Sequence, residues 1–177
     1  MRVYIPEHYS SGVYEISEIS LWDTANNNKF YHVNYGELVD ENNLIEITTP
    51  NPDNTGAVLD VNDITVTAQP SIPEQPNGET FVTITMKVSD DISGIKIGYI
   101  RFLDPQGIQH GYWIYFPYRS DYYFEGDPTE IKSYTFTSTL PKGSAPGTWG
   151  IYEISLTDQA LNKSVYNFAE IIHFTVE

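Results

Sequence analysis

The sequence predicts an all-β protein, and three observations support this fold class. Aromatic residues are frequent, with 14 Tyr, 8 Phe and 3 Trp among 177 residues, and Thr, Val and Ile are abundant. Such side chains fit a pleated, half-buried sheet surface. Apolar and polar residues alternate with a period of two, most clearly in residues 82–88, and this is the period of a strand. No segment combines a sustained helical repeat of apolar positions with capping residues.

The sequence contains an internal repeat, which determines the expected domain organisation. Residues 5–31 align without a gap with residues 140–166 at a constant offset of 135, and 11 of the 27 positions are identical. Apolar residues recur at one spacing, as Tyr14, Ile16, Ile19 and Leu21 in the first copy and Trp149, Ile151, Ile154 and Leu156 in the second. The spacing predicts a strand with a β-bulge at the same place in each copy. A tight turn at the shared Asp-x-Ala-x-Asn segment and a returning strand should follow.

The two copies differ in what precedes them, and this difference sets the predicted boundaries. A long strand-rich segment precedes the second copy, whereas only four residues precede the first. We therefore expect residues 1–50 to be the C-terminal part of a truncated repeat, residues 51–56 to be a linker and residues 57–177 to form a complete repeat. An isolated hairpin is marginally stable in water. The first copy should dock on the complete repeat or form a dimer with another chain.

The complete repeat should contain seven strands. They are expected at residues 58–67, 82–88, 95–103, 110–116, 131–140, 148–156 and 165–176, the last with a break near Ala169. Loops are expected at residues 70–78, 90–94 and 104–107, and an irregular aromatic segment should run from the fourth strand to Pro128. Seven short strands separated by turn residues are typical of an immunoglobulin-like antiparallel β-sandwich.

Several short motifs also resemble a known family. They are Asn54-Thr55-Gly56-Ala57-Val58-Leu59, Val88-Ser89-Asp90-Asp91-Ile92-Ser93-Gly94-Ile95, residues 99–107, Leu140-Pro141, Gly147-Thr148-Trp149 and residues 155–162. In this order they resemble the bacterial immunoglobulin-like repeats of large surface adhesins and multidomain secreted proteins. The resemblance covers residues 54–177 and, in part, residues 5–50, although Leu161 and Ala57 replace the family's usual Gly and Pro. It implies an extracellular or cell-surface spacer or adhesion module with neighbouring repeats as partners.

Composition excludes several classes of function. The formal charge of −15 disfavours binding to nucleic acid or to an anionic membrane surface. Cysteine is absent, so no disulfide or thiolate chemistry is expected. No apolar run is long enough to span a bilayer, and Met1–Ile5 shows no signal-peptide core, so an export signal would lie elsewhere. The four histidines share no metal-ligand spacing and no catalytic motif occurs, so we expect no enzyme.

The acidic loops are a candidate calcium site. If the loops after the second and sixth strands lie at the end where the first strand begins, the linker and loop residues should cluster there. These residues are Asp53, Asp90, Asp91, Asp158 and Asn162. Calcium takes six to eight oxygen ligands of this kind. The alternative is that Asp90, Asp158 and Asn162 only cap turns through their own backbone, and Asp23 and Asn27 of the first copy fit either interpretation.

The aromatic segment is a candidate carbohydrate site. Strand alternation places Tyr112, Ile114 and Phe116 on one face and Trp113 and Tyr115 on the other, so one face lies outside the core. Exposed rings can stack on sugars, and the candidates are Trp113, Tyr115, Tyr118, Tyr122 and Tyr123. The alternative is that the outward rings pack against a loop or cover the first hairpin. The sequence leaves a structural adhesin repeat and a carbohydrate-binding module as the two hypotheses.

Overall fold

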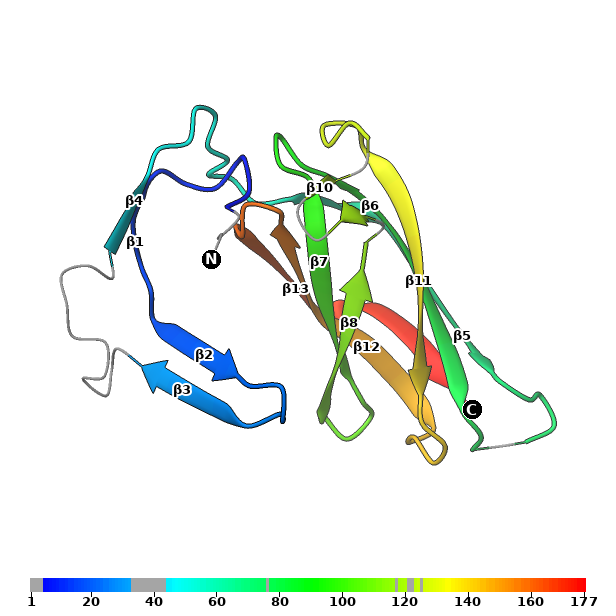
Figure 1. The fold of residues 1–177 in the computed structure, drawn as a ribbon. Helices are drawn as coiled ribbons and strands as arrows, with labels where there is room; N and C mark the ends of the chain where they lie inside the picture. The colour runs from blue at the N-terminus through cyan, green and yellow to red at the C-terminus, as the bar shows by residue number, and fades with distance from the viewer. Residues whose placement is uncertain (1–4, 33–43, 76, 117, 121–122, 125) are drawn as a thin grey trace.

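The protein is all-β, as a computed structural model of the chain shows (Figure 1). The structure describes residues 5–32, 44–75, 77–116, 118–120, 123–124 and 126–177. Within these residues there are thirteen strands and no helix. The all-β class predicted from the period-two pattern is therefore confirmed.

The strands are named in their order along the chain. They are β1 (Gly12–Glu15), β2 (Glu18–Trp22), β3 (Asn28–His32), β4 (Leu44–Ile47), β5 (Val58–Pro70), β6 (Thr80–Ser89), β7 (Ile95–Leu103), β8 (Gln109–Tyr115), β9 (Tyr118–Ser120), β10 (Tyr123–Phe124), β11 (Lys132–Leu140), β12 (Gly147–Asp158) and β13 (Lys163–Val176). The seven strands predicted for residues 57–177 correspond to β5–β8 and β11–β13. One expectation was wrong: the segment after β8 holds the short antiparallel pair β9–β10. The break expected near Ala169 occurs in the pairing, because the register of β13 against β12 shifts between Asn167 and Ile172 within one continuous strand.

Two antiparallel sheets form the body of the protein. One has the strand order β11-β6-β5 and the other the order β13-β12-β7-β8, and they face each other as in a β-sandwich (Figure 1). The register of β12 shifts between Ile151 and Glu153 against both of its neighbours. This is the place at which the sequence predicted a β-bulge.

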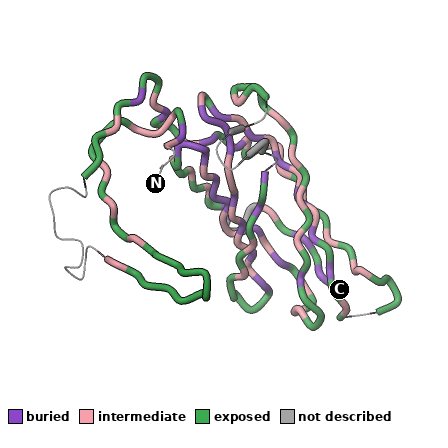
Figure 2. The backbone as a smooth tube through the Cα atoms, viewed as in Figure 1, coloured by how far each residue is buried: buried purple, intermediate pink, exposed green. Residues whose placement is uncertain are grey.

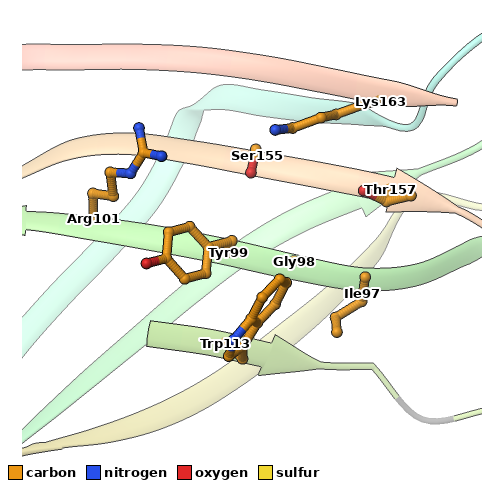
Figure 3. Close-up of a pocket in the computed structure, with 8 residues that line it drawn as sticks. All are labelled: Ile97, Gly98, Tyr99, Arg101, Trp113, Ser155, Thr157 and Lys163. Carbon is orange, nitrogen blue, oxygen red and sulfur yellow. The ribbon is translucent and has the colours of Figure 1, made fainter. Parts of the chain in front are cut away.

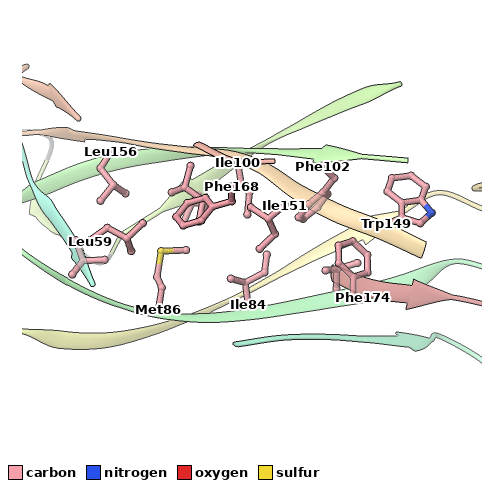
Figure 4. Packing of buried hydrophobic residues seen from close by; sticks show 14 of the residues in the cluster. Leu59, Ile84, Met86, Ile100, Phe102, Trp149, Ile151, Leu156, Phe168 and Phe174 are labelled. Carbon is pink, nitrogen blue, oxygen red and sulfur yellow. The ribbon is translucent and has the colours of Figure 1, made fainter. Parts of the chain in front are cut away.

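The hydrophobic core lies between these two sheets. Strand β6 contributes every second residue, with Val82, Ile84, Met86 and Val88 all buried, as the alternation predicts. Figure 4 shows Ile84 and Met86 facing side chains of the other sheet, including Ile100, Phe102, Trp149, Ile151, Leu156 and Phe174. Each large apolar side chain buried in this way contributes about 1.5–3 kcal/mol relative to exposure.

The first copy of the repeat forms a hairpin with the register of the second copy. Strand β2 pairs with β3 so that Ile19 lies opposite Tyr31, and Ile154 lies opposite Tyr166 in the β12–β13 pair. The turns also correspond: the Asp23 carboxylate accepts the Asn27 N–H at 2.9 Å, as the Asp158 carboxylate accepts the Asn162 N–H at 2.7 Å. Local sequence therefore produces the same hairpin twice.

The two hairpins differ in burial. Leu156 of β12 is 0% exposed, whereas Leu21, which occupies the corresponding position of β2, is 55% exposed. Figure 2 shows β2 and β3 as mostly exposed, in contrast to the buried strands of the sandwich. Within the described residues, β2 pairs only with β3. In the part of the chain that the structure describes, no strand of the sandwich covers this hairpin in the way that β7 and the opposite sheet cover β12.

Candidate functional site

Three buried carboxylates gather at one end of the sandwich. Asp53 lies in the segment that leads into β5, Asp90 directly follows β6, and Asp158 is the last residue of β12. All three side chains are buried, and each offers an oxygen within 4.8 Å of the oxygens of the other two. The antiparallel pairing places these segments together, because β5 begins where β6 ends, with Val58 opposite Ser89.

Asp90 and Asp158 each fix their own turn. One oxygen of Asp90 accepts the Gly94 N–H at 2.6 Å, and its other oxygen, Oδ1, is buried and has no hydrogen-bond partner among the described residues. Asp158 accepts hydrogen bonds from the Asn162 backbone N–H at 2.7 Å and from the Asn162 amide at 2.9 Å. Turn capping therefore occurs, as one interpretation of the sequence expected, and one carboxylate oxygen remains without a partner.

Asp53 ties the linker to both loops. Its carboxylate accepts the Ser93 N–H at 3.0 Å and the Thr55 N–H at 3.0 Å. The Asn162 amide nitrogen donates to the Asp53 carbonyl at 3.1 Å, so Asn162 contacts two of the acids as a hydrogen-bond donor. Asp91, the remaining predicted residue, is exposed and lies outside the group of three.

Burial and mutual repulsion perturb these acids. Burial raises the pKa of Asp158 to about 6; hydrogen bonds from Asn162 oppose this rise, and the negative charges of Asp53 and Asp90 add to it. Burial also raises the pKa of Asp90, against the effect of the Gly94 hydrogen bond. For Asp53, burial favours a higher pKa, but hydrogen bonds from Ser93 and Thr55 outweigh it and the pKa is lowered.

The cluster has the chemistry of a hard-cation site. No Lys or Arg forms an ion pair with these acids in the described part of the chain. Near neutral pH the three carboxylates repel one another unless a proton or a cation neutralises them. Carboxylate oxygens are ligands that Ca²⁺ prefers, and the unpartnered Asp90 Oδ1 has lone pairs to offer. Asp53, Asp90 and Asp158 could therefore hold a calcium ion.

The outward rings of β8 are exposed. Ile114 and Phe116 are buried, whereas Trp113 is 59% and Tyr115 is 66% exposed, so the predicted alternation of faces is confirmed. Tyr118 and Tyr123 lie in β9 and β10, and nothing is described of their side chains; Tyr122 lies outside the described residues.

Beside Trp113, the outer face of the four-stranded sheet is hollowed into a groove of about 370 Å³. It is lined by Ile97, Gly98, Tyr99, Arg101, Trp113, Ser155, Thr157 and Lys163 (Figure 3). Sequence reasoning did not single out most of these residues. The alternation along β7 and β12 could have predicted that these residues lie on the outer face of the sheet. It could not have predicted which of them are neighbours, because that depends on the register between the strands.

A further polar group lies at the opposite end of β12 and was not predicted. The His110 ring is 3.0 Å from the Asp104 carboxylate. Both residues line a small hollow together with Ser144. The Ser144 hydroxyl donates to the Pro141 carbonyl at 2.7 Å, and Asp104 accepts the Ile108 N–H at 2.8 Å and the Gln106 N–H at 2.9 Å. These contacts fix two turns, and the described residues show no hydrogen bond from Ser144 to His110.

Comparison with known proteins adds no family assignment: no protein-family model matches the chain, and no curated protein has a significantly similar sequence. Among the described residues, no helix is long and apolar enough to cross a membrane.

Proposed function

We propose that this chain is a non-catalytic structural and adhesion module of a large bacterial surface or secreted protein. In this proposal residues 57–177 are an immunoglobulin-like repeat, residues 1–50 are the C-terminal part of another repeat, and calcium stiffens the junction between them. The observation that carries the proposal is the set of three buried carboxylates. It joins the linker, through Asp53, to the loops that contain Asp90 and Asp158.

The repeat interpretation has support beyond the shared register. The Trp149 ring N–H donates to the Ala145 carbonyl at 2.8 Å, and at the same offset the Tyr14 hydroxyl donates to the Ser10 carbonyl at 2.6 Å. Asn26 and Leu161, which also correspond, have positive φ angles of 69° and 73°. A shared turn conformation at non-glycine residues is uncommon by chance and favours duplication of one unit.

Calcium is expected to raise the melting temperature of the full chain. An ion that binds only the folded state at a concentration 100 times its Kd stabilises that state by about 2.7 kcal/mol. For a chain of this length, this corresponds to an increase of roughly 5–10 °C. Differential scanning calorimetry with millimolar calcium and with a chelator measures the difference.

Three variants make this test specific. Asp90→Asn and Asp158→Asn should lose the calcium-dependent increase, and in chelator they should melt no lower than the parent chain, because they remove repulsion between the carboxylates. Asp23→Asn is the matched control, since Asp23 caps the same turn in the exposed hairpin and should leave the increase intact. If the parent chain melts at the same temperature in calcium and in chelator, Asp53, Asp90 and Asp158 do not bind calcium and act only as turn caps.

Neighbouring repeats are the partners that the first hairpin requires. Its exposed apolar residues include Leu21, Trp22 and Phe30, and its counterpart β12–β13 is covered by β7 and by the sheet that contains β5 and β6. Fusing residues 57–139 ahead of Ile5 supplies the same kind of cover. We expect slower amide hydrogen exchange in β2 of the fusion. Unchanged exchange in β2 would contradict the proposal. In that case a second copy of the chain would cover the hairpin instead, and sedimentation would detect the dimer.

A second candidate function is carbohydrate binding. The observation that favours it is the exposure of Trp113 and Tyr115 beside a groove on the outer sheet face. Exposed aromatic rings provide flat apolar surface on which sugar rings can stack. An affinity gel that contains polysaccharide tests this function, with Trp113→Ala as the binding-deficient variant.

A further inference from the structure

The groove on the outer face arises from the order of side-chain sizes across the sheet. Trp113 of β8 lies opposite Tyr99 of β7, and Tyr99 lies opposite Ser155 of β12. Two residues along the strands, in the neighbouring row of the same outer face, Ile97 lies opposite Thr157. Thr157 in turn lies opposite Lys163 of β13. Directly opposed residues share a face of the sheet. Large side chains on β7, β8 and β13 therefore flank small hydroxyl residues on β12, and this order produces a trough.

The aromatic wall of the groove is held in place by its surroundings. The rings of Tyr99 and Trp113 meet edge to face, with centroids 4.8 Å apart and an angle of 60° between their planes. Gly111 of β8 permits this arrangement, because a Cβ atom there would overlap the Tyr99 hydroxyl. Trp113 remains 59% exposed, so its ring offers apolar surface to a ligand in the groove.

The other side of the groove is cationic. Arg101 and Lys163 are two of the nine basic residues in a chain of net charge −15. Figure 3 shows the Arg101 side chain extending from β7 toward β12 and the Lys163 side chain lying along the other side of β12. The Arg101 guanidinium lies 5.5 Å from the centre of the Tyr99 ring and binds Glu153 at 3.1 Å. Within the described residues Lys163 has no ion pair, so its charge is available to an anion.

The first repeat does not conserve this surface. At the offset of 135, Ser155 corresponds to Ser20, but Thr157 corresponds to Trp22 and Lys163 to Asn28. The hairpin itself is shared by both copies, so it requires neither the hydroxyl nor the ammonium group at these positions. Thr157 and Lys163 are therefore a property of this one unit, as expected of a ligand site rather than of the framework.

From this arrangement we propose that the groove binds a carboxylated sugar, such as a uronic acid unit of an acidic glycan. The inference rests on the second candidate function, carbohydrate binding, and specifies its site and ligand class. The sugar ring stacks on Trp113 and Tyr99, one of its hydroxyls meets that of Thr157, and its carboxylate pairs with the Lys163 ammonium. Ser155 also lines the groove but is only 4% exposed. Charge-assisted hydrogen bonds of this kind are stronger than neutral ones.

Titration of the full chain by ¹H–¹⁵N NMR tests this proposal through the indole N–H resonances. Glucuronate, glucose and acetate are the probes, because they separate the ring from the carboxylate. We expect glucuronate to shift the Trp113 resonance, and to bind more tightly than either glucose or acetate. The buried Trp149 should keep its resonance, which reports that the fold is intact.

Variants then assign the two halves of the site. Lys163→Gln should weaken glucuronate binding about tenfold, as expected for loss of a charge-assisted hydrogen bond, and leave glucose binding unchanged. Trp113→Ala should weaken the binding of both glucose and glucuronate. Gly111→Ala should have the same effect, because the added Cβ atom would displace Tyr99. The matched controls are Lys87→Gln and Phe81→Ala, which change an exposed cation and an exposed ring on the other sheet.

The outcomes separate this inference from the function on which it rests. Equal binding of glucose and glucuronate, with no effect of Lys163→Gln, would overturn the carboxylated class and leave sugar binding in place. Binding of acetate as tight as that of glucuronate would show that the ring contributes nothing and would overturn the inference. The absence of any shift at Trp113 with all three probes would overturn both.

Discussion

Replacing Leu156 with alanine is expected to lower the free energy of unfolding by about 2–5 kcal/mol, the range for truncating a buried leucine. Leu156 is 0% exposed in the core between the two sheets. The corresponding change in the first copy, Leu21→Ala, should cost less than about 0.5 kcal/mol, because Leu21 is 55% exposed. Chemical denaturation of the two variants measures the difference, at a protein concentration at which sedimentation shows a monomer.

This pair of variants is informative because the local sequence is shared. Both leucines follow Glu-Ile-Ser and precede an Asp-x-Ala-x-Asn turn, so strand propensity and turn chemistry are matched and burial is the variable. In the fusion that places residues 57–139 ahead of Ile5, Leu21→Ala should become as costly as Leu156→Ala. Equal costs in the unfused monomeric chain would contradict the exposure of the first hairpin.

The second large effect is on the pH dependence of stability in the absence of calcium. Burial raises the pKa of Asp158 from 3.8 to about 6 in the folded state. Between these two pH values the folded chain holds a proton that the unfolded chain has lost, so stability falls as the pH rises. A difference of this size corresponds to about 3 kcal/mol, at about 1.4 kcal/mol per pKa unit. The pKa of Asp90 is also raised, so Asp90 adds to the fall in stability as the pH rises.

Denaturation in chelator at pH values from 4 to 7 measures this fall. Asp158→Asn should remove most of it, because the amide does not titrate. Asp53 does not counteract it in this range: its pKa is lowered, so its stabilisation is complete above pH 3.8 and is lost only at lower pH. A parent chain whose stability stays constant or rises over this range, with no difference from Asp158→Asn, would contradict the assignment.

Calcium should reverse this dependence if the cluster binds the ion. The metal competes with the proton for the carboxylates, so its affinity increases with pH. In millimolar calcium the fall in stability between pH 4 and pH 7 should be smaller than in chelator or should become a rise. The pH series in chelator tests the raised pKa of Asp158, and the series in calcium tests whether the same three acids bind the ion.

The features that depend on neighbouring residues could be predicted from the amino-acid sequence. The all-β class, the seven main strands, the bulge in β12 and the inward positions of Ile114 and Phe116 all follow from a period of two and its interruptions. The Asp158–Asn162 turn follows in the same way, because its hydrogen bonds join residues only four positions apart. Its counterpart at Asp23 forms without a sandwich around it.

Contacts between residues that are distant in the sequence depend on how the strands pair and how the sheets pack. The register of β7 and β8 against β12 brings Trp113, Tyr99 and Ser155 into one row, and no spacing along the chain specifies such a register. The sequence placed Asp91 with the other acids, but Asp90 is 3% exposed within the cluster and its neighbour Asp91 is exposed. Likewise Leu21 and Leu156 share one local pattern and differ in burial, because only β12 has β7 beside it and an opposite sheet to cover it. Local periodicity sets the direction of a side chain, and the packing of distant strands sets its environment.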